Sequence, residues 1–305
     1  MKIAYRTEKG IFYECELEKA LSSKEFKKYI GKFDLIFFSP PFPLNRKKKY
    51  GNLQGEEYIS WLANIGFLLA EFLSPTGSIV LEIGNSWEEG SPVMSTLPLK
   101  SLLAFLERGE YKLCQQFIWH NKAKLPSPIE WVNKRRIRVK DSFTSIWWMS
   151  KGAYPKANNK NVLQEYSTRM RKLLDEQNYN SGRRPSEHII NGTSFLTNNG
   201  GAIPSNVLIS SNTDSNSKYL NFCRENGITP HPARMPMDLP EFFIRFLTDA
   251  GDLVFDPFGG SNTTGEVCEM LDRNWVSVEI DEEYIKGSQG RFRNIIMENG
   301  KASIK

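Results

Sequence analysis

Several features that define common protein classes are missing from this sequence of 305 residues. The four cysteines lie far apart with no C-x-x-C pair, and the chain has only three histidines. We therefore expect reduced core thiols, no disulfide framework and no metal site. The chain also lacks an apolar run of about 18 residues, as a membrane helix needs, and its start lacks the apolar core of a signal peptide. These absences favour a soluble, cytoplasmic protein with no membrane contact.

The charge of the chain is only mildly basic. The 40 Lys and Arg residues outnumber the 35 Asp and Glu residues, which gives a net charge of +5. Enzymes that act on small anionic metabolites have a similar balance. The basic residues are nevertheless clustered, and such clusters suit phosphate contacts, although each could instead be a solvated face. The two clusters are Arg46, Lys47, Lys48 and Lys49, and Lys134, Arg135, Arg136, Arg138 and Lys140.

Apolar segments alternate between strand-like and helical patterns along most of the chain. Residues 33–38 (FDLIFF) form a short apolar run that ends at SPPFP, where two prolines oppose both helix and sheet hydrogen bonding. A helical pattern follows over 57–73, and then the strand-like run SIVLEIG. This order favours a parallel sheet with helices on both faces. The same patterns predict helices over 97–108, 239–247 and 265–271, and strands over 111–120, 143–149, 253–255 and 276–280.

The composition becomes polar between residues 153 and 226. Asn, Ser, Gly and charged residues dominate there, and only residues 162–176 show a good helical pattern. Disorder is one interpretation of so polar a segment, but Ile189, Ile190, Phe195 and the run 207–209 supply apolar anchors. We therefore predict a separate lobe inserted into the α/β domain.

A strand, a glycine-containing turn and a helix start follow one another over residues 254–265 (VFDPFGGSNTTG). Glycines let the backbone approach a nucleotide-type cofactor, and a helix start offers free N–H groups. Glu279 ends the next predicted strand, where an acidic side chain can accept hydrogen bonds from both hydroxyls of a ribose. The absence of G-x-G-x-x-G disfavours NAD. Taken alone, the segment could also be a tight strand-to-helix connection.

The segment Ser39-Pro40-Pro41-Phe42 stands at the carboxyl end of a predicted strand, where open α/β sheets bind their ligands. The amine of a nucleobase is a poor nucleophile because its lone pair is conjugated with the ring. The Ser39 hydroxyl and the Pro40 carbonyl could hold the two amine protons, and Phe42 could stack on the base. The alternative is a proline-rich loop with a buried phenylalanine.

SPPF after an apolar strand, followed later by DPFGGSNTTG, resembles the amino-methyltransferases of DNA in their permuted β order. The resemblance extends to HPAR at 231–234, to GSIVLEIG, to residues 117–143 and into the polar lobe. It implies a Rossmann-like S-adenosylmethionine-dependent methyltransferase sheet with an inserted target-recognition lobe. The implied parts are a catalytic part over 1–152, the lobe over 153–226 and a cofactor-binding part over 227–305.

The resemblance also implies a role for each matching residue. Ser39, Pro40, Pro41 and Phe42 would hold the target amine, and the leading serine is typical of the cytosine-N4 subtype, since adenine enzymes usually carry Asp or Asn. Glu16 stands where such enzymes often have a Gly-Asp pair, and Asn262 where many have Gly. The implied S-adenosylmethionine contacts are Asp256, Phe258, Gly259, Gly260, Ser261, Thr263, Thr264, Glu279, Arg234 and Glu16. The expected DNA contacts are Arg46, Lys47, Lys48, Lys49, Lys134, Arg135, Arg136 and Arg138.

The implied reaction is methyl transfer to the N4 amine of a cytosine in a specific double-stranded DNA site. No covalent intermediate is needed, and no cysteine stands in the Pro-Cys setting of the carbon-5 enzymes. The target base must leave the duplex, since its amine is paired there. A restriction endonuclease acting on the same site would be a biological partner. Three alternatives stay open: N6-adenine methylation, a DNA-binding regulator without turnover, and methylation of RNA or protein.

Overall fold

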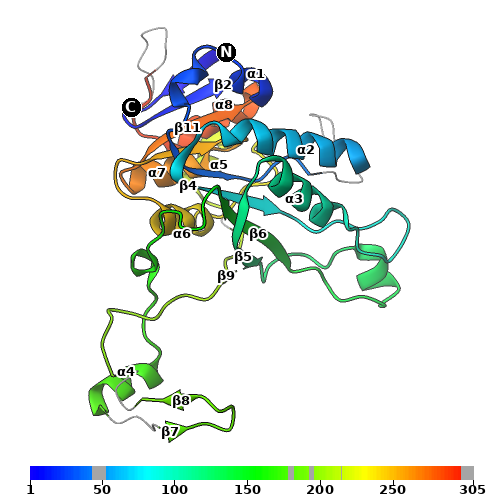
Figure 1. Cartoon of the computed structure of the whole chain (residues 1–305). Helices are drawn as coiled ribbons and strands as arrows, with labels where there is room; N and C mark the ends of the chain where they lie inside the picture. The colour runs from blue at the N-terminus through cyan, green and yellow to red at the C-terminus, as the bar shows by residue number, and fades with distance from the viewer. Residues whose placement is uncertain (43–52, 178–181, 192–195, 214, 297–305) are drawn as a thin grey trace. The chain divides into compact units, whose positions relative to one another are not determined.

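The computed structural model of the chain describes residues 1–42, 53–177, 182–191, 196–213 and 215–296. The chain divides into two compact units, one of residues 1–157 and 206–305 and the other of residues 158–205. A nine-stranded sheet forms the centre of the first unit (Figure 1). In sheet order its strands are β1 (Lys2–Arg6), β2 (Gly10–Glu14), β11 (Asn274–Glu279), β10 (Leu253–Asp256), β3 (Phe33–Phe38), β4 (Leu73–Ile83), β6 (Phe143–Ser150), β5 (Lys112–His120) and β9 (Val207–Ile209).

The five strands β2, β11, β10, β3 and β4 run parallel, so their carboxyl ends share one edge of the sheet. The expected parallel pairing holds for these five strands, whereas β1 and β6 are antiparallel to their neighbours. Both strands belong to hairpin-like pairs, and a direct return of the chain produces antiparallel pairing. As a result, β5 ends and β6 begins at the same edge as the carboxyl ends of the parallel strands.

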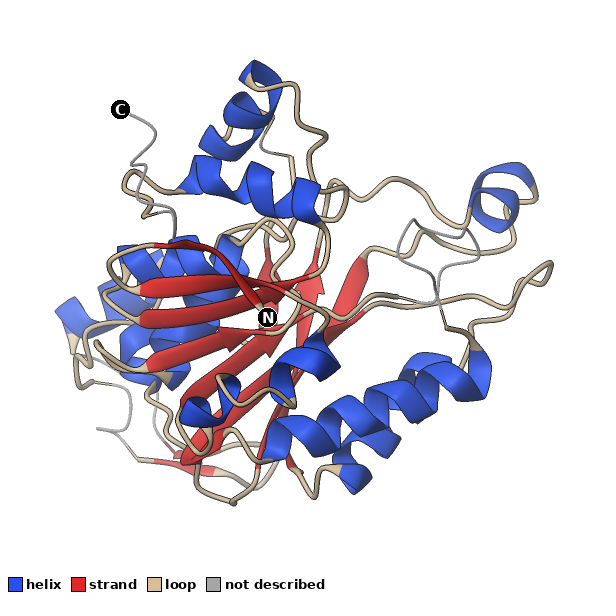
Figure 2. Cartoon of the chain, turned by 90° about the horizontal axis from the view of Figure 1, so that it is seen from above, coloured by secondary structure: helices blue, strands red, loops and turns tan. Residues whose placement is uncertain are grey.

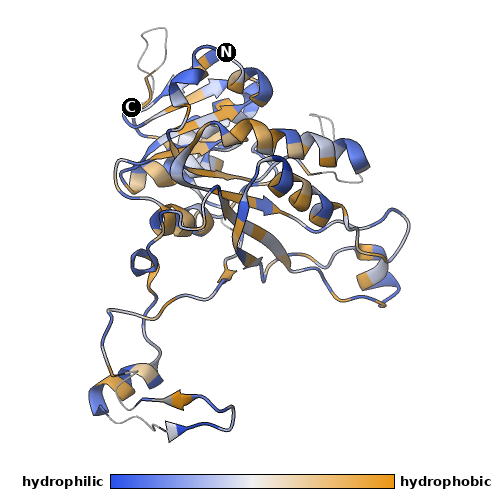
Figure 3. Ribbon diagram, viewed as in Figure 1, coloured by the Kyte–Doolittle hydropathy of each residue, from blue (hydrophilic) through white to orange (hydrophobic). Residues whose placement is uncertain are grey.

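Helices cover both faces of the sheet, as expected (Figure 2). Alternate side chains of β3 point to opposite faces, so Ile36 and Phe38 join one apolar core while Leu35 and Phe37 join the other. Figure 3 shows apolar residues along the strands and the helices that cover them. The first core includes α1 (Leu17–Leu21), η1 (Phe26–Tyr29), α2 (Gly55–Ala70) and α3 (Leu97–Arg108), and the second includes α6 (Asp238–Leu247), α7 (Thr263–Met270) and α8 (Glu282–Ser288).

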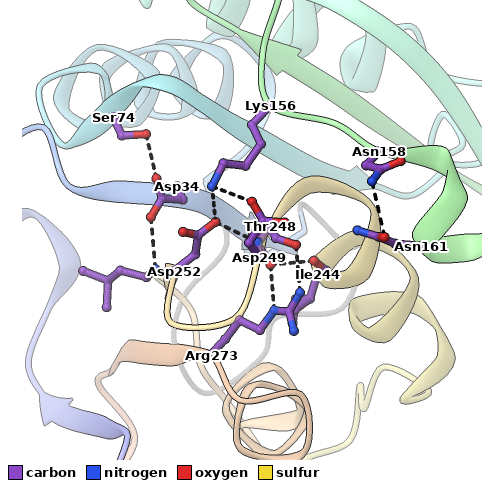
Figure 4. A network of polar contacts seen from close by, with 11 residues as sticks. Asp34, Ser74, Lys156, Asn158, Asn161, Ile244, Thr248, Asp249, Asp252 and Arg273 are labelled. Carbon is purple, nitrogen blue, oxygen red and sulfur yellow. Dashed lines mark hydrogen bonds and ion pairs between the residues drawn. The ribbon is translucent and has the colours of Figure 1, made fainter.

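Polar contacts at the opposite edge, where the parallel strands begin, join three strands (Figure 4). The carboxylate of Asp34 on β3 accepts hydrogen bonds from the Ser74 hydroxyl of β4 at 3.0 Å and from the Leu253 N–H of β10 at 3.1 Å. The ammonium group of Lys156 lies 2.6 Å from Asp252 beside β10. These contacts fix the relative positions of the strands whose other ends carry the predicted motifs.

The second unit holds η3 (Asn159–Val162), α4 (Thr168–Glu176) and the antiparallel pair β7 (Gly182–Arg183) and β8 (Ile189–Ile190). The helix predicted over 162–176 begins only at Thr168, because the Ser167 hydroxyl caps it by accepting a hydrogen bond from the Met170 N–H. The compact unit is narrower than the predicted lobe of residues 153–226, since β9 and α5 (Lys218–Glu225) belong to the first unit. Target recognition by this part of the chain stays a prediction.

The remaining short helices of the described residues are η2 (Glu130–Lys134), between β5 and β6, and η4 (Gln289–Arg291). The predicted helix over 97–108 is confirmed as α3 at both ends. Trp147 and Trp148 are buried in β6. None of the helices in the described ranges is long and apolar enough to cross a membrane.

Candidate active site

The two sequence motifs meet where the direction of chain progression through the sheet reverses. Strand β10 continues through α7 to β11 on one side, whereas its other neighbour, β3, continues through α2 to β4 on the opposite side. Phe255 of β10 pairs with Ile36 of β3, so the turn after β10 and the SPPF segment leave the sheet side by side. Open α/β sheets bind their ligands at such a reversal.

Asp256 ends β10 and is buried. Its carboxyl group accepts a hydrogen bond from the Thr264 hydroxyl at 2.6 Å and one from the Phe258 N–H at 3.1 Å. Burial raises the pKa of Asp256 to about 7, and the two hydrogen bonds oppose that rise. The side chain therefore joins the end of β10 to the start of α7 and fixes the shape of the turn between them.

Glu279 ends β11 beside this turn. One carboxylate oxygen accepts a hydrogen bond from the Gly260 N–H at 2.8 Å, and the other accepts from the N–H groups of Ile280 and Asp281 at 2.9 and 3.0 Å. Burial raises the pKa of Glu279, whereas the three backbone donors stabilise its charged form. The carboxylate is thereby held at the strand end, at the place predicted for a ribose-binding acid.

The turn itself needs glycine at two positions. A Cβ atom on Gly259 would lie 2.8 Å from the Phe12 ring, and Gly260 has a positive φ of +49°. Asn262 also has a positive φ, of 54°, and its side chain is fully buried. Its carboxamide accepts hydrogen bonds from the Gly265 N–H and the Ser277 hydroxyl and donates one to the Tyr5 hydroxyl. Asn262 thus points into the protein interior and caps α7.

The other hydroxyl side chains of the turn are buried as well. Ser261 and Thr263 are 5% and 6% exposed, and their hydroxyl groups are 3.3 Å apart. Arg291 donates hydrogen bonds to the backbone carbonyl and the hydroxyl of Ser261 and forms an ion pair with Glu266. These side chains stabilise the turn through contacts with one another, so the backbone of the turn would make any contact with a ligand.

The segment 231–234 lies against the same turn. The His231 ring is 3.3 Å from the position that a Cβ atom on Gly260 would occupy, and the Arg234 guanidinium donates to the His231 carbonyl at 2.7 Å. Glu16 follows β2, where the Cys15 N–H donates to the Glu279 carbonyl, and it forms an ion pair with Lys19. Arg234 and Glu16, the two predicted cofactor contacts, therefore lie at the edge of the sheet that carries Glu279.

A carboxyl group not singled out in the sequence completes the SPPF site. Phe38 of β3 pairs with Leu81 of β4, which brings the next residues, Ser39 and Glu82, opposite each other. This pairing places the Ser39 hydroxyl beside the buried carboxyl group of Glu82. Burial raises the pKa of Glu82, whereas the neighbouring Ser39 hydroxyl and the charge of Lys124 lower it. The sequence signal that could have identified Glu82 is a single acidic residue inside the apolar run SIVLEIG.

Aromatic rings enclose the space between the two motifs. The Phe258 ring of the cofactor turn lies 5.8 Å from Phe38 and 5.8 Å from Trp61 of α2, measured between ring centres. Phe42 lies against Gly84, where an added Cβ atom would come within 3.3 Å of its ring. Pro40 is buried, and Pro41 and Phe42 are half-buried. The site thus combines apolar walls with the hydroxyl and carboxyl groups of Ser39 and Glu82.

The predicted DNA contacts fall on two segments. Arg46, Lys47, Lys48 and Lys49 lie outside the described residues. The second cluster is exposed between β5 and β6, where Lys134 and Arg135 form ion pairs with Glu130 and Arg138 donates to the Pro92 carbonyl. Within the described ranges, no group of three His, Cys, Asp or Glu side chains is arranged to hold a metal ion.

Comparisons with known proteins agree with this arrangement. The N6/N4 methyltransferase family model, described as DNA methylase, matches residues 33–290. The chain is 45% identical over 293 residues to the type II methyltransferase M.PvuII of Proteus hauseri, covering 95% of this chain and 86% of that protein.

Solved structures give the same result. The PvuII DNA methyltransferase (cytosine-N4-specific) superposes with a TM-score of 0.75 at 39% identity, covering 95% of this chain and 89% of that one. The complex of M1.HpyAVI with S-adenosylmethionine, at 19% identity and a TM-score of 0.53, supports the fold alone. The family match spans both motifs and the strands that carry them, and the chain therefore belongs to the DNA methylase family.

Proposed function

We propose that this protein transfers a methyl group from S-adenosylmethionine to the N4 amine of a cytosine flipped out of double-stranded DNA. The observation that carries the proposal is the position of Ser39 at the end of β3, beside Glu82 and adjacent to the turn after β10. The PvuII DNA methyltransferase, whose solved structure is 39% identical in sequence to this chain, is cytosine-N4-specific.

The residues around the turn fit S-adenosylmethionine. Glu279 is fixed by three backbone donors, and its carboxylate keeps lone pairs with which it can accept hydrogen bonds from ribose hydroxyls. Ile280, which follows it, is 61% exposed and offers an apolar surface to a purine ring. When bound, the cofactor supplies an electrophilic methyl group. His231 and Arg234, which lie at the turn, would close over its methionine end.

The protein side of the reaction is the handling of one amine proton. Methylation of the amine releases a proton, and the Ser39 hydroxyl can accept a hydrogen bond from that amine while donating its own to Glu82. The raised pKa of Glu82 makes its carboxylate a better proton acceptor than an exposed one. The Pro40 carbonyl can bind the second amine proton, and Phe42 can stack on the base.

The DNA-binding part of the proposal involves the basic segment between β5 and β6 and the polar lobe. Lys134, Arg135, Arg136 and Arg138 would contact phosphates beside the target, and residues 153–226 would read the sequence. Arg46, Lys47, Lys48 and Lys49, which follow SPPF, would contact the backbone near the flipped nucleotide. In the cell, the methylation would protect host DNA beside a restriction endonuclease that cuts the same site.

Long-read kinetic sequencing of DNA from cells that express the protein tests this proposal. The expected result is N4-methylcytosine within one short motif. N6-methyladenine in such a motif would still support DNA methylation. It would overturn the assignment of cytosine N4 as the methylated amine, which is based on Ser39. DNA without modification, from cells with soluble protein, would contradict methyl transfer to DNA.

A further inference from the structure

The chain between β5 and β6 combines basic charge with exposed apolar side chains. This segment, residues 121–142, is called the β5–β6 protrusion here. It contains seven Lys and Arg residues against two Asp and Glu residues, which gives a net charge of +5, the same as that of the whole chain. Four of its large apolar side chains are exposed, with Leu125 at 80% and Val139 at 86% as the extremes. Exposed apolar side chains within so basic a segment point to a polyanionic partner with an apolar interior, as duplex DNA has.

The protrusion starts at the edge of the sheet that carries the active site. Strand β5 ends and β6 begins at that edge, and Figure 1 shows the intervening chain extending beyond it. Asp141 accepts a hydrogen bond at 2.8 Å from Asn85, in the loop that follows β4 and Glu82. Lys124, the neighbour of Leu125, is near enough to Glu82 to lower the pKa of that carboxyl group. The base of the protrusion is therefore next to the active site.

The base of the protrusion is held in one conformation by its own polar contacts. The ammonium group of Lys140 donates to the carbonyls of Lys122 and Lys124, at 3.2 and 3.4 Å, and Lys124 forms an ion pair with Asp141. These contacts hold the chain just before Leu125 next to the chain just after Val139. The chain beside both exposed apolar residues is therefore held by contacts within the protrusion, which lowers the backbone entropy lost on binding.

We propose that Leu125 and Val139 form an apolar wedge that enters the DNA duplex next to the flipped cytosine. The inference rests on the proposed function. Flipping a base leaves a gap in the stack and costs a few kcal/mol, and apolar side chains that fill the gap offset part of this loss. The basic residues around the pair contact the flanking phosphates, whereas charged side chains could not fill the gap favourably.

The test compares the Leu125→Ala/Val139→Ala double variant with wild type on two DNA substrates that contain the motif found by sequencing. In the first duplex the target cytosine is paired with guanine, and in the second it lies opposite an abasic position, so that it leaves the stack easily. A matched control, Leu103→Ala, removes an apolar side chain that is 64% exposed on α3, outside the protrusion. Single-turnover methylation rates and S-adenosylmethionine affinity are measured for all three proteins.

The expected result is a rate about tenfold lower or more for the double variant on the paired duplex, with cofactor affinity unchanged. On the abasic duplex the double variant should recover to within about twofold of wild type, and Leu103→Ala should match wild type on both. An unchanged rate on the paired duplex, or an equal loss on both duplexes, overturns the wedge. A change of oligomeric state in the double variant also overturns it, because the pair would then be a protein contact. Wild type that methylates neither duplex refutes the proposed function itself, which is a separate outcome.

Discussion

The Ser39 hydroxyl lies beside the carboxyl group of Glu82, because the two residues follow paired positions of the neighbouring parallel strands β3 and β4. This contact converts a hydroxyl group at the end of a strand into the first member of a route by which a proton can leave the substrate. Burial of Glu82 keeps that route away from bulk water. The first two predictions test the role of this pair and of the ring beside it.

Replacement of Glu82 by glutamine keeps the shape of the side chain and removes its ability to accept a proton. We expect kcat to fall by about 10²- to 10⁴-fold, with S-adenosylmethionine affinity little changed. In wild type, the rate should rise with pH as Glu82 loses its proton, at a pH above the ordinary range of a glutamate because burial raises its pKa. A pH profile of single-turnover rates measures this, and a Glu82→Gln variant that keeps the same profile would contradict it.

Replacement of Phe42 by alanine removes the ring that lies against Gly84. Base–aromatic stacking contributes about 1–3 kcal/mol, so we expect methyl transfer to fall by about tenfold or more. Ser39→Ala should also lower transfer strongly. Isothermal titration with S-adenosylmethionine is the control, because both variants should bind it nearly as wild type does. An equal loss of cofactor affinity would place these residues in the wrong part of the site.

Asp256 should make the stability of the protein depend on pH. Its folded-state pKa of about 7 lies above its ordinary value of 3.8, so the folded protein holds a proton that the unfolded chain releases as the pH rises between these values. This group therefore lowers stability as the pH rises from about 4 to 7. The Tm of Asp256→Asn minus the Tm of wild type should therefore increase by about 3 °C or more between pH 5 and pH 8. A Tm difference that is constant with pH would contradict this.

Asn262 should matter for the stability of the cofactor turn. Asn262→Ala removes the contacts to Gly265, Ser277 and Tyr5 and leaves an ordinary side chain at a φ of 54°. Asn262→Gly removes the same contacts without the backbone strain. We expect alanine to lower the free energy of unfolding by about 2–4 kcal/mol and glycine by about 1 kcal/mol less than alanine. Chemical denaturation measures both, and glycine being the more harmful would contradict the role of the backbone.

The sequence predicted much of the fold because strong patterns coincide with local structure. Alternation of apolar runs and helical spacing gave β3, α3 and the β10–α7–β11 unit, and the two motifs were expected at strand ends. Hairpin pairing was not expected: β1 and β2 are short, and β5 and β6 are separated by the 22 residues 121–142, too long for a recognisable turn. The polar lobe offered few patterns, so the start of α4 at the Ser167 cap was missed.

The residues of the site also divide into those that local patterns could predict and those that long-range contacts determine. Ser39, Asp256 and Glu279 stand next to motifs with local signatures, so their places could be predicted. The role of Glu82 depends on the register between β3 and β4, and Asn262 depends on contacts with Tyr5 from the other end of the chain. Such long-range contacts leave no local pattern, so single-sequence reasoning does not reveal them.

The central claim is methyl transfer to the N4 amine of cytosine with Ser39 and Glu82 at the amine. Its most direct test is mass spectrometry of the nucleosides from unmodified DNA incubated with the purified protein and S-adenosylmethionine bearing a deuterated methyl group. The account predicts deuterated N4-methylcytosine with wild type, and a strongly reduced amount with Ser39→Ala and Glu82→Gln. Label in N6-methyladenine, or wild-type amounts of N4-methylcytosine from both variants, would contradict it.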